Sequence, residues 1–126
     1  MLRSVTLGLA LSVLAAACAL VEPPVPAGTF ALPGEVRNMR AVPVELEVRT
    51  PTGTLPGAVQ PASLPAGPST TKVTYHVPIT GQWSIAVDGD PYIVSGDFGA
   101  EIRQGCTLGL ELSADGSSGY GCNMWP

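Results

Sequence analysis

The residues with the most distinctive chemistry are three cysteines and a single histidine. Cys106 and Cys122 lie near the C-terminal end, whereas Cys18 follows an apolar run near the start. When two of three cysteines pair, one thiol is left without a partner. We expect a disulfide between Cys106 and Cys122, which closes a short loop in an oxidising compartment. A redox-active pair is the alternative, but the Cys-x-x-Cys spacing typical of such pairs is missing.

The turn between these two cysteines decides whether they can meet. A two-residue turn at Asp115-Gly116 would place Gly109, not Cys106, opposite Cys122. A wider loop centred on Ala114, or a bulge at Gly116, brings the two cysteines together. We favour the wider loop, because a glycine suits a left-handed backbone position.

Catalytic residues are hard to find in this sequence. His76 alternates with apolar residues beside Lys72 and Thr74, so we expect its ring on the water-facing side of a strand. A single histidine excludes the two-histidine set of blue-copper sites and argues against hydrolytic zinc. No G-x-S-x-G motif frames a serine. We therefore expect no catalytic residues, no cofactor and no enzymatic activity.

Carboxylates cluster at Asp88, Asp90, Asp97 and Glu101. Oxygen ligands on loops are what calcium binds, so a weak Ca²⁺ site at one end of the domain is one interpretation. The alternative is structural and is favoured here: Asp88-Gly89 is a hairpin turn signal, and Asp90-Pro91 begins the next strand.

The first residues have the features of a targeting segment. Arg3 is followed by an uncharged stretch, residues 5–17, that is shorter than the roughly 20 residues needed to span a bilayer. Ala15-x-Ala17 fits ordinary signal cleavage before Cys18. The stretch Leu14-Ala-Ala-Ala-Cys18 resembles the lipobox of bacterial lipoproteins, although that family usually has Leu where this chain has Ala15.

This resemblance implies that the Cys18 sulfur carries a diacylglyceryl group and anchors the protein to a membrane outside the cytoplasm. Secretion as a soluble protein after ordinary cleavage is the alternative. We divide the chain into a signal peptide at 1–17, a lipidation site and proline-rich tether at 18–33, and a folded domain at 34–126.

Alternating apolar and polar residues predict an all-β fold. The clearest runs contain Val44, Leu46 and Val48, then Val73, Tyr75 and Val77, then Trp83, Ile85 and Val87. Turn residues separate these runs, which is typical of an antiparallel sandwich. We expect seven or eight strands, near residues 35–39, 42–50, 57–62, 70–77, 82–88, 91–95 and 105–112, with 117–124 as a closing edge strand.

The strand count at this length resembles an immunoglobulin or fibronectin-III-like sandwich, and the stretch from Val77 to Val87 resembles a strand pair found in many bacterial extracellular accessory domains. The resemblance implies an architecture and no activity. Tyr75, Trp83 and Phe98 are expected in the core, because the first two are in phase with inward aliphatic residues.

Ten acidic residues against six basic ones argue against a nucleic-acid partner. The sequence favours a non-catalytic envelope protein that binds another envelope protein or a glycan. The alternative is a small-ligand or substrate-binding accessory of a transport or hydrolase system, which would need a concave site.

Overall fold

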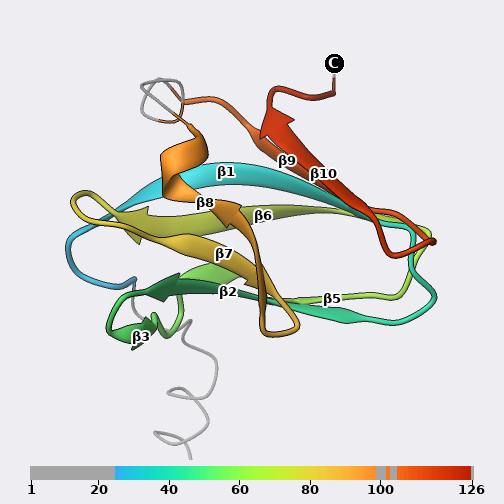
Figure 1. Ribbon diagram of the computed structural model, residues 1–126, viewed down its shortest axis with the longest axis horizontal. Coiled ribbons are helices and arrows are strands. Elements are labelled where there is room, and N and C mark those ends of the chain that lie inside the picture. The colour runs from blue at the N-terminus through green and yellow to red at the C-terminus, as the bar shows by residue number, and fades with distance from the viewer. Residues whose placement is uncertain (1–24, 99–101, 103–104, 126) are drawn as a thin grey trace, which may run out of the picture.

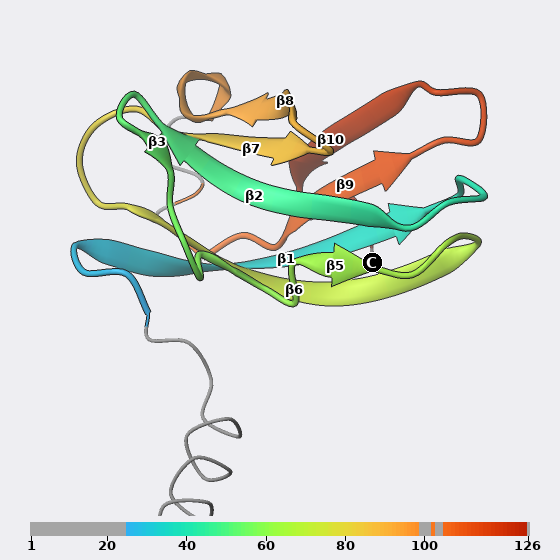
Figure 2. The same cartoon turned by 90° about the horizontal axis from the view of Figure 1, so that it is seen from below.

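The computed structural model describes residues 25–98, 102 and 105–125. In this part of the chain two β-sheets pack face to face around one hydrophobic core (Figures 1 and 2). The all-β, two-layer fold is the one expected. One sheet has the order β10-β9-β1-β6-β4, and the other has the order β3-β2-β7-β8 with β5 also paired to β2. The strands are β1 (Thr29–Asn38), β2 (Val44–Thr50), β3 (Gly53–Thr54), β4 (Val59–Gln60), β5 (Ser63–Leu64), β6 (Ser69–Pro78), β7 (Ser84–Val87), β8 (Asp90–Val94), β9 (Leu108–Leu112) and β10 (Ser118–Cys122).

Period-two alternation explains why the long strands form. In β2, Val44, Leu46 and Val48 are buried, while the glutamates between them face outward. Val42, which was expected at the start of this strand, is exposed and lies before it. The Asn38 side chain explains the late start, because its Nδ2 donates to the Val42 carbonyl and holds residues 38–42 in a turn.

The first strand begins earlier than the sequence indicated. β1 starts at Thr29, so residues 29–33 belong to the sheet and not to a tether, and the expected domain start at residue 34 falls inside the strand. Pro33 argued against a strand at these residues, because proline has no N–H to donate to a neighbouring strand. It is accommodated because β9 pairs with β1 only from Gly34 onward, which leaves one edge of the earlier residues unpaired.

One strand pair departs from the expected antiparallel arrangement. β9 runs parallel to β1, from the Gly34–Leu108 pair to the Asn38–Leu112 pair. The chain crosses from the second sheet back to the first between β8 and β9, through the short 3-10 helix η1 (Ser95–Asp97). The sheets are therefore antiparallel with this one parallel pair among the described strands. Among these residues no helix is long and apolar enough to cross a membrane.

The core is apolar and includes the expected aromatic residues. Tyr75 is fully buried and Trp83 is buried, and Phe98 packs against the core from its rim. Burial raises the pKa of the Tyr75 phenol well above its ordinary value. A side chain at position 34 would collide with this ring, since an added Cβ would lie 2.4 Å from Tyr75 Cε2.

Candidate functional site

The disulfide expected from the cysteine count is present, between Cys106 and Cys122, with Cα atoms 5.4 Å apart. Cys122 lies opposite Leu108 in the β9–β10 register, so the two cysteines are diagonal neighbours and not directly opposed. The hairpin loop is wider than a two-residue turn, as expected. It is centred on Asp115 and not on Ala114, because the Ser113 N–H donates to the Ser117 carbonyl.

Gly116 adopts the left-handed conformation that was expected, with φ of 92°. The Asp115 carboxylate accepts hydrogen bonds from both the hydroxyl and the N–H of Ser117. These bonds lower the pKa of Asp115, and the bond from the Ser117 hydroxyl contributes more than the bond from the N–H. The disulfide and this ordered loop thus fix the two ends of the β9–β10 hairpin. Cys18, the third cysteine, lies outside the described residues.

The expectation that His76 faces water is wrong, because its exposed fraction is 9%. β6 lies between β1 and β4, so His76 has neighbours on both sides of its strand. Ala31 is the partner of His76 on β1, and the His76 N–H donates to the Ala58 carbonyl at 2.6 Å. Alternation along one strand shows which face a residue takes, but not how far neighbouring strands cover that face.

The carboxylates considered for calcium do not form a metal-binding group. Asp88 accepts a hydrogen bond from the Glu45 N–H, and Asp97 accepts one from the Tyr120 hydroxyl. Asp90 is exposed at the start of β8. Within residues 25–98, 102 and 105–125, no three His, Cys, Asp or Glu side chains are placed to share a metal ion. Glu101 lies outside the described residues.

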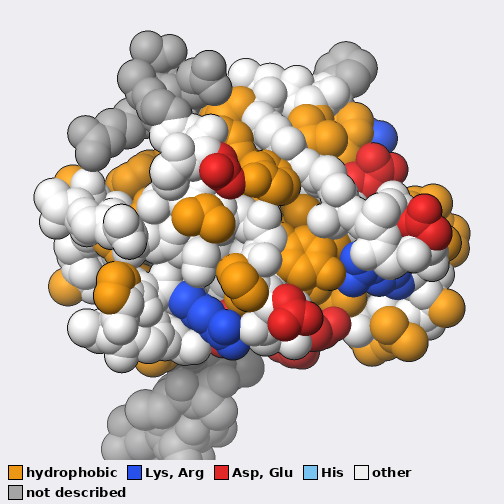
Figure 3. All heavy atoms as spheres, in the orientation of Figure 1, with side chains coloured by type: hydrophobic (Ala, Val, Ile, Leu, Met, Phe, Trp, Pro, Cys, Tyr) orange, Lys and Arg blue, Asp and Glu red, His pale blue; other side chains and the backbone are white. Residues whose placement is uncertain are grey.

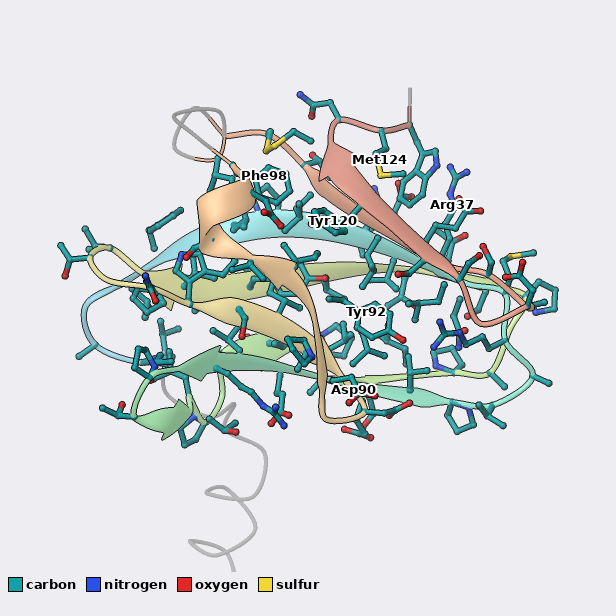
Figure 4. The ribbon with its side chains drawn as sticks, viewed as in Figure 1. Arg37, Asp90, Tyr92, Phe98, Tyr120 and Met124 are labelled. Atoms are coloured by element: carbon teal, nitrogen blue, oxygen red, sulfur yellow. A yellow bond between two sulfur atoms is a disulfide. The ribbon has the colours of Figure 1, made fainter. Side chains whose placement is uncertain are left out.

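Aromatic side chains line the open side of the sandwich, between β8 and β10 (Figure 4). Tyr92 lies at a β-bulge in the β7–β8 pair, which turns its ring toward Arg40. The Arg40 guanidinium donates to the Tyr92 hydroxyl at 3.3 Å and lies 5.7 Å from the ring centroid. In the space-filling view this face carries hydrophobic side chains at its centre, with charged side chains around them (Figure 3).

Tyr120 on β10 completes this aromatic side. Its ring lies 5.7 Å from the Phe98 ring, at an angle of 53°. Its hydroxyl donates to Asp97, which raises the pKa of Tyr120, with smaller contributions from burial and from the carboxylate charge. The end of η1 is therefore attached to the edge strand of the other sheet.

The outer face of the first sheet is covered near its β10 end by the last described residues. An added Cβ at Gly109 would lie 3.0 Å from the Trp125 ring and 3.2 Å from Met124, so the glycine leaves room for both. The Arg37 guanidinium lies 4.0 Å from the centroid of the Trp125 ring, a cation–π contact.

A groove of about 740 Å³ lies beside β4. One wall is the segment from Thr54 to Ala62, and the others include Leu46 and Glu47 of β2 and Thr74 of β6. The Glu47 carboxylate is held by Arg49 at 2.7 Å and by the Thr54 hydroxyl at 2.9 Å. Volumes of this order are typical of small-ligand sites, which are mostly apolar with a few polar groups.

Comparison with known proteins gives no match, either to a protein-family model, to a curated protein or to a solved structure. Function must therefore be argued from the residues themselves.

Sequence reasoning missed Arg40, Tyr92 and Tyr120. Arg40 and Tyr92 lie far apart in the chain and are joined by a hydrogen bond, whereas Tyr120 meets Phe98 and Asp97. The signal available for Tyr120 was its position between two glycines, and for Tyr92 its place after Asp90-Pro91 at an edge strand. Neither signal indicates a partner.

Proposed function

We propose that this chain is a lipid-anchored, non-catalytic protein of the bacterial cell envelope, whose β-sandwich is of immunoglobulin or fibronectin-III-like type and serves as a binding or structural module. The observation that carries the proposal is the Cys106–Cys122 disulfide. It uses both cysteines of the sandwich and leaves Cys18 as the third thiol, directly after Leu14-Ala-Ala-Ala17. A disulfide also supports maturation in an oxidising compartment.

In this proposal Cys18 is acylated and holds the protein on a membrane. More than one acyl chain makes such anchoring durable, because a single chain binds only marginally. The residues between Cys18 and β1 include Pro23, Pro24 and Pro26, and this composition favours an extended spacer. The sandwich is then displayed near the membrane surface, where its partner is another envelope protein or a glycan.

Cys18→Ser tests the anchor directly. We expect the wild-type chain to incorporate a palmitate analogue and to fractionate with membranes, and the Ser variant to do neither while keeping its disulfide and its fold. Ala15→Leu is the matched control, since it restores the Leu usual at this lipobox position and should label at least as strongly. Labelling that persists in Cys18→Ser, or that is absent from the wild type, would refute lipid anchoring.

The groove beside β4 favours a second candidate function, the binding of a small ligand for a transport or hydrolase system. Its volume of about 740 Å³ suits a small molecule, and Glu47, Thr54, Gln60 and Thr74 offer polar contacts on a mainly apolar wall. A pull-down from solubilised envelope separates the two functions. A stoichiometric protein partner supports the first, whereas a lone chain whose melting temperature rises with a sugar or an ion supports the second.

Gln60→Trp sharpens this comparison, because a large ring at the groove should remove any ligand-induced rise in melting temperature. Thr52→Trp, at an exposed position outside the groove, is the control and should keep the rise. Loss of the rise in both variants, or in neither, would argue against a ligand in the groove.

A further inference from the structure

The edge strands of the two sheets differ in the features that prevent pairing with a strand of another chain. β3 and β4 are strands of two residues, too short to template another strand. β8 begins with an exposed aspartate and a proline, Asp90-Pro91, and contains a bulge. β10, the edge of the first sheet, pairs with β9 without a register shift and contains neither proline nor a charged residue. Charges, prolines and bulges are the usual devices that prevent edge pairing, and β10 has none of them.

The backbone of β10 points alternate hydrogen-bonding groups away from the sheet. The Asn123 N–H donates to the Thr107 carbonyl, so residue 123 faces the β9 side. Because hydrogen-bonded and non-bonded pairs alternate in an antiparallel ladder, the N–H and C=O groups of Ser118, Tyr120 and Cys122 face the free edge.

The sequence of this edge is nearly symmetric about Tyr120. Ser118-Gly-Tyr-Gly-Cys122 is the same in both directions apart from Ser118 and Cys122, whose side chains are similar in size. If a second β10 paired antiparallel about a two-fold axis at Tyr120, each glycine would oppose a glycine. The two tyrosines would then oppose each other as a cross-strand aromatic pair. Such self-complementarity is what a two-fold interface requires.

Side chains on both faces of β10 offer apolar surface to a second copy. Tyr120 is 36% exposed on the side of the sandwich opening, and Met124, 38% exposed, packs over Gly121 on the outer face. Figure 4 shows the two on either side of the β10 ribbon. Pairing would bury part of both side chains.

β10 itself carries no charged side chain, and the carboxylate that contacts it, Asp97, accepts the hydrogen bond of the Tyr120 hydroxyl. The chain has a formal net charge of −4, so two copies repel each other over most of their surface. The nearest charge on the neighbouring strand is Glu111, opposite Gly119. With strands about 4.8 Å apart and an offset of two residues along the strand, Glu111 and its copy would be separated by roughly 16 Å, which exceeds the Debye length of about 8 Å at physiological ionic strength.

We propose that β10 is a homodimer interface, in which it pairs antiparallel with β10 of a second copy about a two-fold axis at Tyr120. The sheet that contains β10 in one copy and the same sheet in the second copy then form one continuous sheet across the dimer. The Tyr120 residues exchange both backbone hydrogen bonds, and Ser118 of each copy does so with Cys122 of the other.

The test uses charges placed on the two-fold axis. In the full chain with Cys18→Ser, which removes any acyl group that could drive association, sedimentation equilibrium should detect dimers. Tyr120→Lys and Tyr120→Glu each place like charges opposite each other, so each variant alone should be monomeric. Mixed in equal amounts, the two variants should associate again, because opposite charges then meet across the axis.

Val94→Lys, on the exposed edge of the other sheet, is the control and should leave the dimer intact. Ser118→Pro provides a second disruption that does not depend on charge, since it removes an outward N–H. It should give a monomer with the disulfide still formed. A Cys18→Ser chain with no further change that stays monomeric up to the millimolar range would overturn the proposal, as would a Tyr120→Lys and Tyr120→Glu mixture that does not associate. Dissociation by Val94→Lys would place the interface on another edge.

Discussion

The ring of Tyr75 occupies the space that a side chain at residue 34 would fill. An added Cβ at Gly34 would lie 2.4 Å from Tyr75 Cε2 and 3.0 Å from Val73 Cγ2. Because Tyr75 is fully buried, its ring cannot move into solvent. We expect Gly34→Ala to lower the free energy of unfolding by about 1–3 kcal/mol, the usual cost of overpacking, as measured by urea denaturation.

Gly119→Ala is the matched control for this substitution. Gly119 lies in a strand of the same sheet, and an added Cβ there meets no atom within 4 Å. At protein concentrations low enough to keep the chain monomeric, we expect the stability of Gly119→Ala to stay within about 0.5 kcal/mol of the wild type. Equal effects of Gly34→Ala and Gly119→Ala would show that packing against Tyr75 is not the cause.

A second single-residue contact, made by the hydroxyl of Tyr120, depends on pH. Its hydrogen bond to Asp97 holds the pKa of the phenol above the ordinary value. The bond needs a protonated phenol, so its contribution to stability is complete below the pKa of an unfolded tyrosine. That contribution is lost as the pH rises through the higher pKa of the folded state.

Removing the carboxylate tests this coupling. In Asp97→Ala, which removes both the acceptor oxygen and the charge, we expect one tyrosine to titrate at lower pH than in the wild type, as followed by phenolate absorbance. Asp90→Ala, at the exposed start of β8, should leave the titration unchanged. An Asp97→Ala titration identical to the wild type would contradict the assigned cause of the shift.

Among the elements, the strands with clear alternation were predictable and the irregular ones were not. β2, β6 and β7 lie where alternating residues predicted them. Of the expected strand at 57–62 only Val59–Gln60, which is β4, forms a strand, and the next strand, β5, begins at Ser63 and pairs with the other sheet. Alternation could not show this, because the chain crosses between the layers there.

Pairing between strands far apart in the sequence was the second feature that could not be predicted. The parallel β1–β9 pair joins Gly34 to Leu108, and no local pattern encodes a contact over that separation. The disulfide was predictable because it depends on counting cysteines. The contacts of Arg40 were not, since its partners lie on two hairpins that only the fold brings together.

The disulfide should stabilise the β9–β10 hairpin as an element. It joins residues 16 apart in sequence and so restricts the unfolded chain, a contribution of about 3 kcal/mol. We expect Cys106→Ser combined with Cys122→Ser to lower the denaturation midpoint, and a reductant to lower the wild-type midpoint to a similar value without affecting the double variant. Two free thiols titrated in the native, air-purified protein would contradict the pairing.

At the scale of the whole molecule, one turn joins the two sheets at the end where β1 leaves the first sheet. The Asn38 amide donates to the carbonyls of Val42 and Pro65, both at 3.0 Å, which ties the turn to the loop between β5 and β6. Arg40 extends from the same turn to the hairpin loop of β9 and β10, and to Tyr92 of β8. Its guanidinium donates to the carbonyls of Ser113, Gly116 and Ser117.

Arg40 should therefore contribute more to stability than an ordinary surface arginine. Arg40→Ala leaves backbone carbonyls and the Tyr92 hydroxyl without their donor, and we expect a loss of about 1–2 kcal/mol in urea denaturation. Arg40→Lys should recover only part of this loss, because an ammonium group cannot reach the same set of acceptors as the guanidinium fork. Lys72→Ala, at an exposed position, is the control and should change stability by less than about 0.5 kcal/mol. If Arg40→Ala were as stable as Lys72→Ala, packing of the core alone would hold the two sheets together at this end.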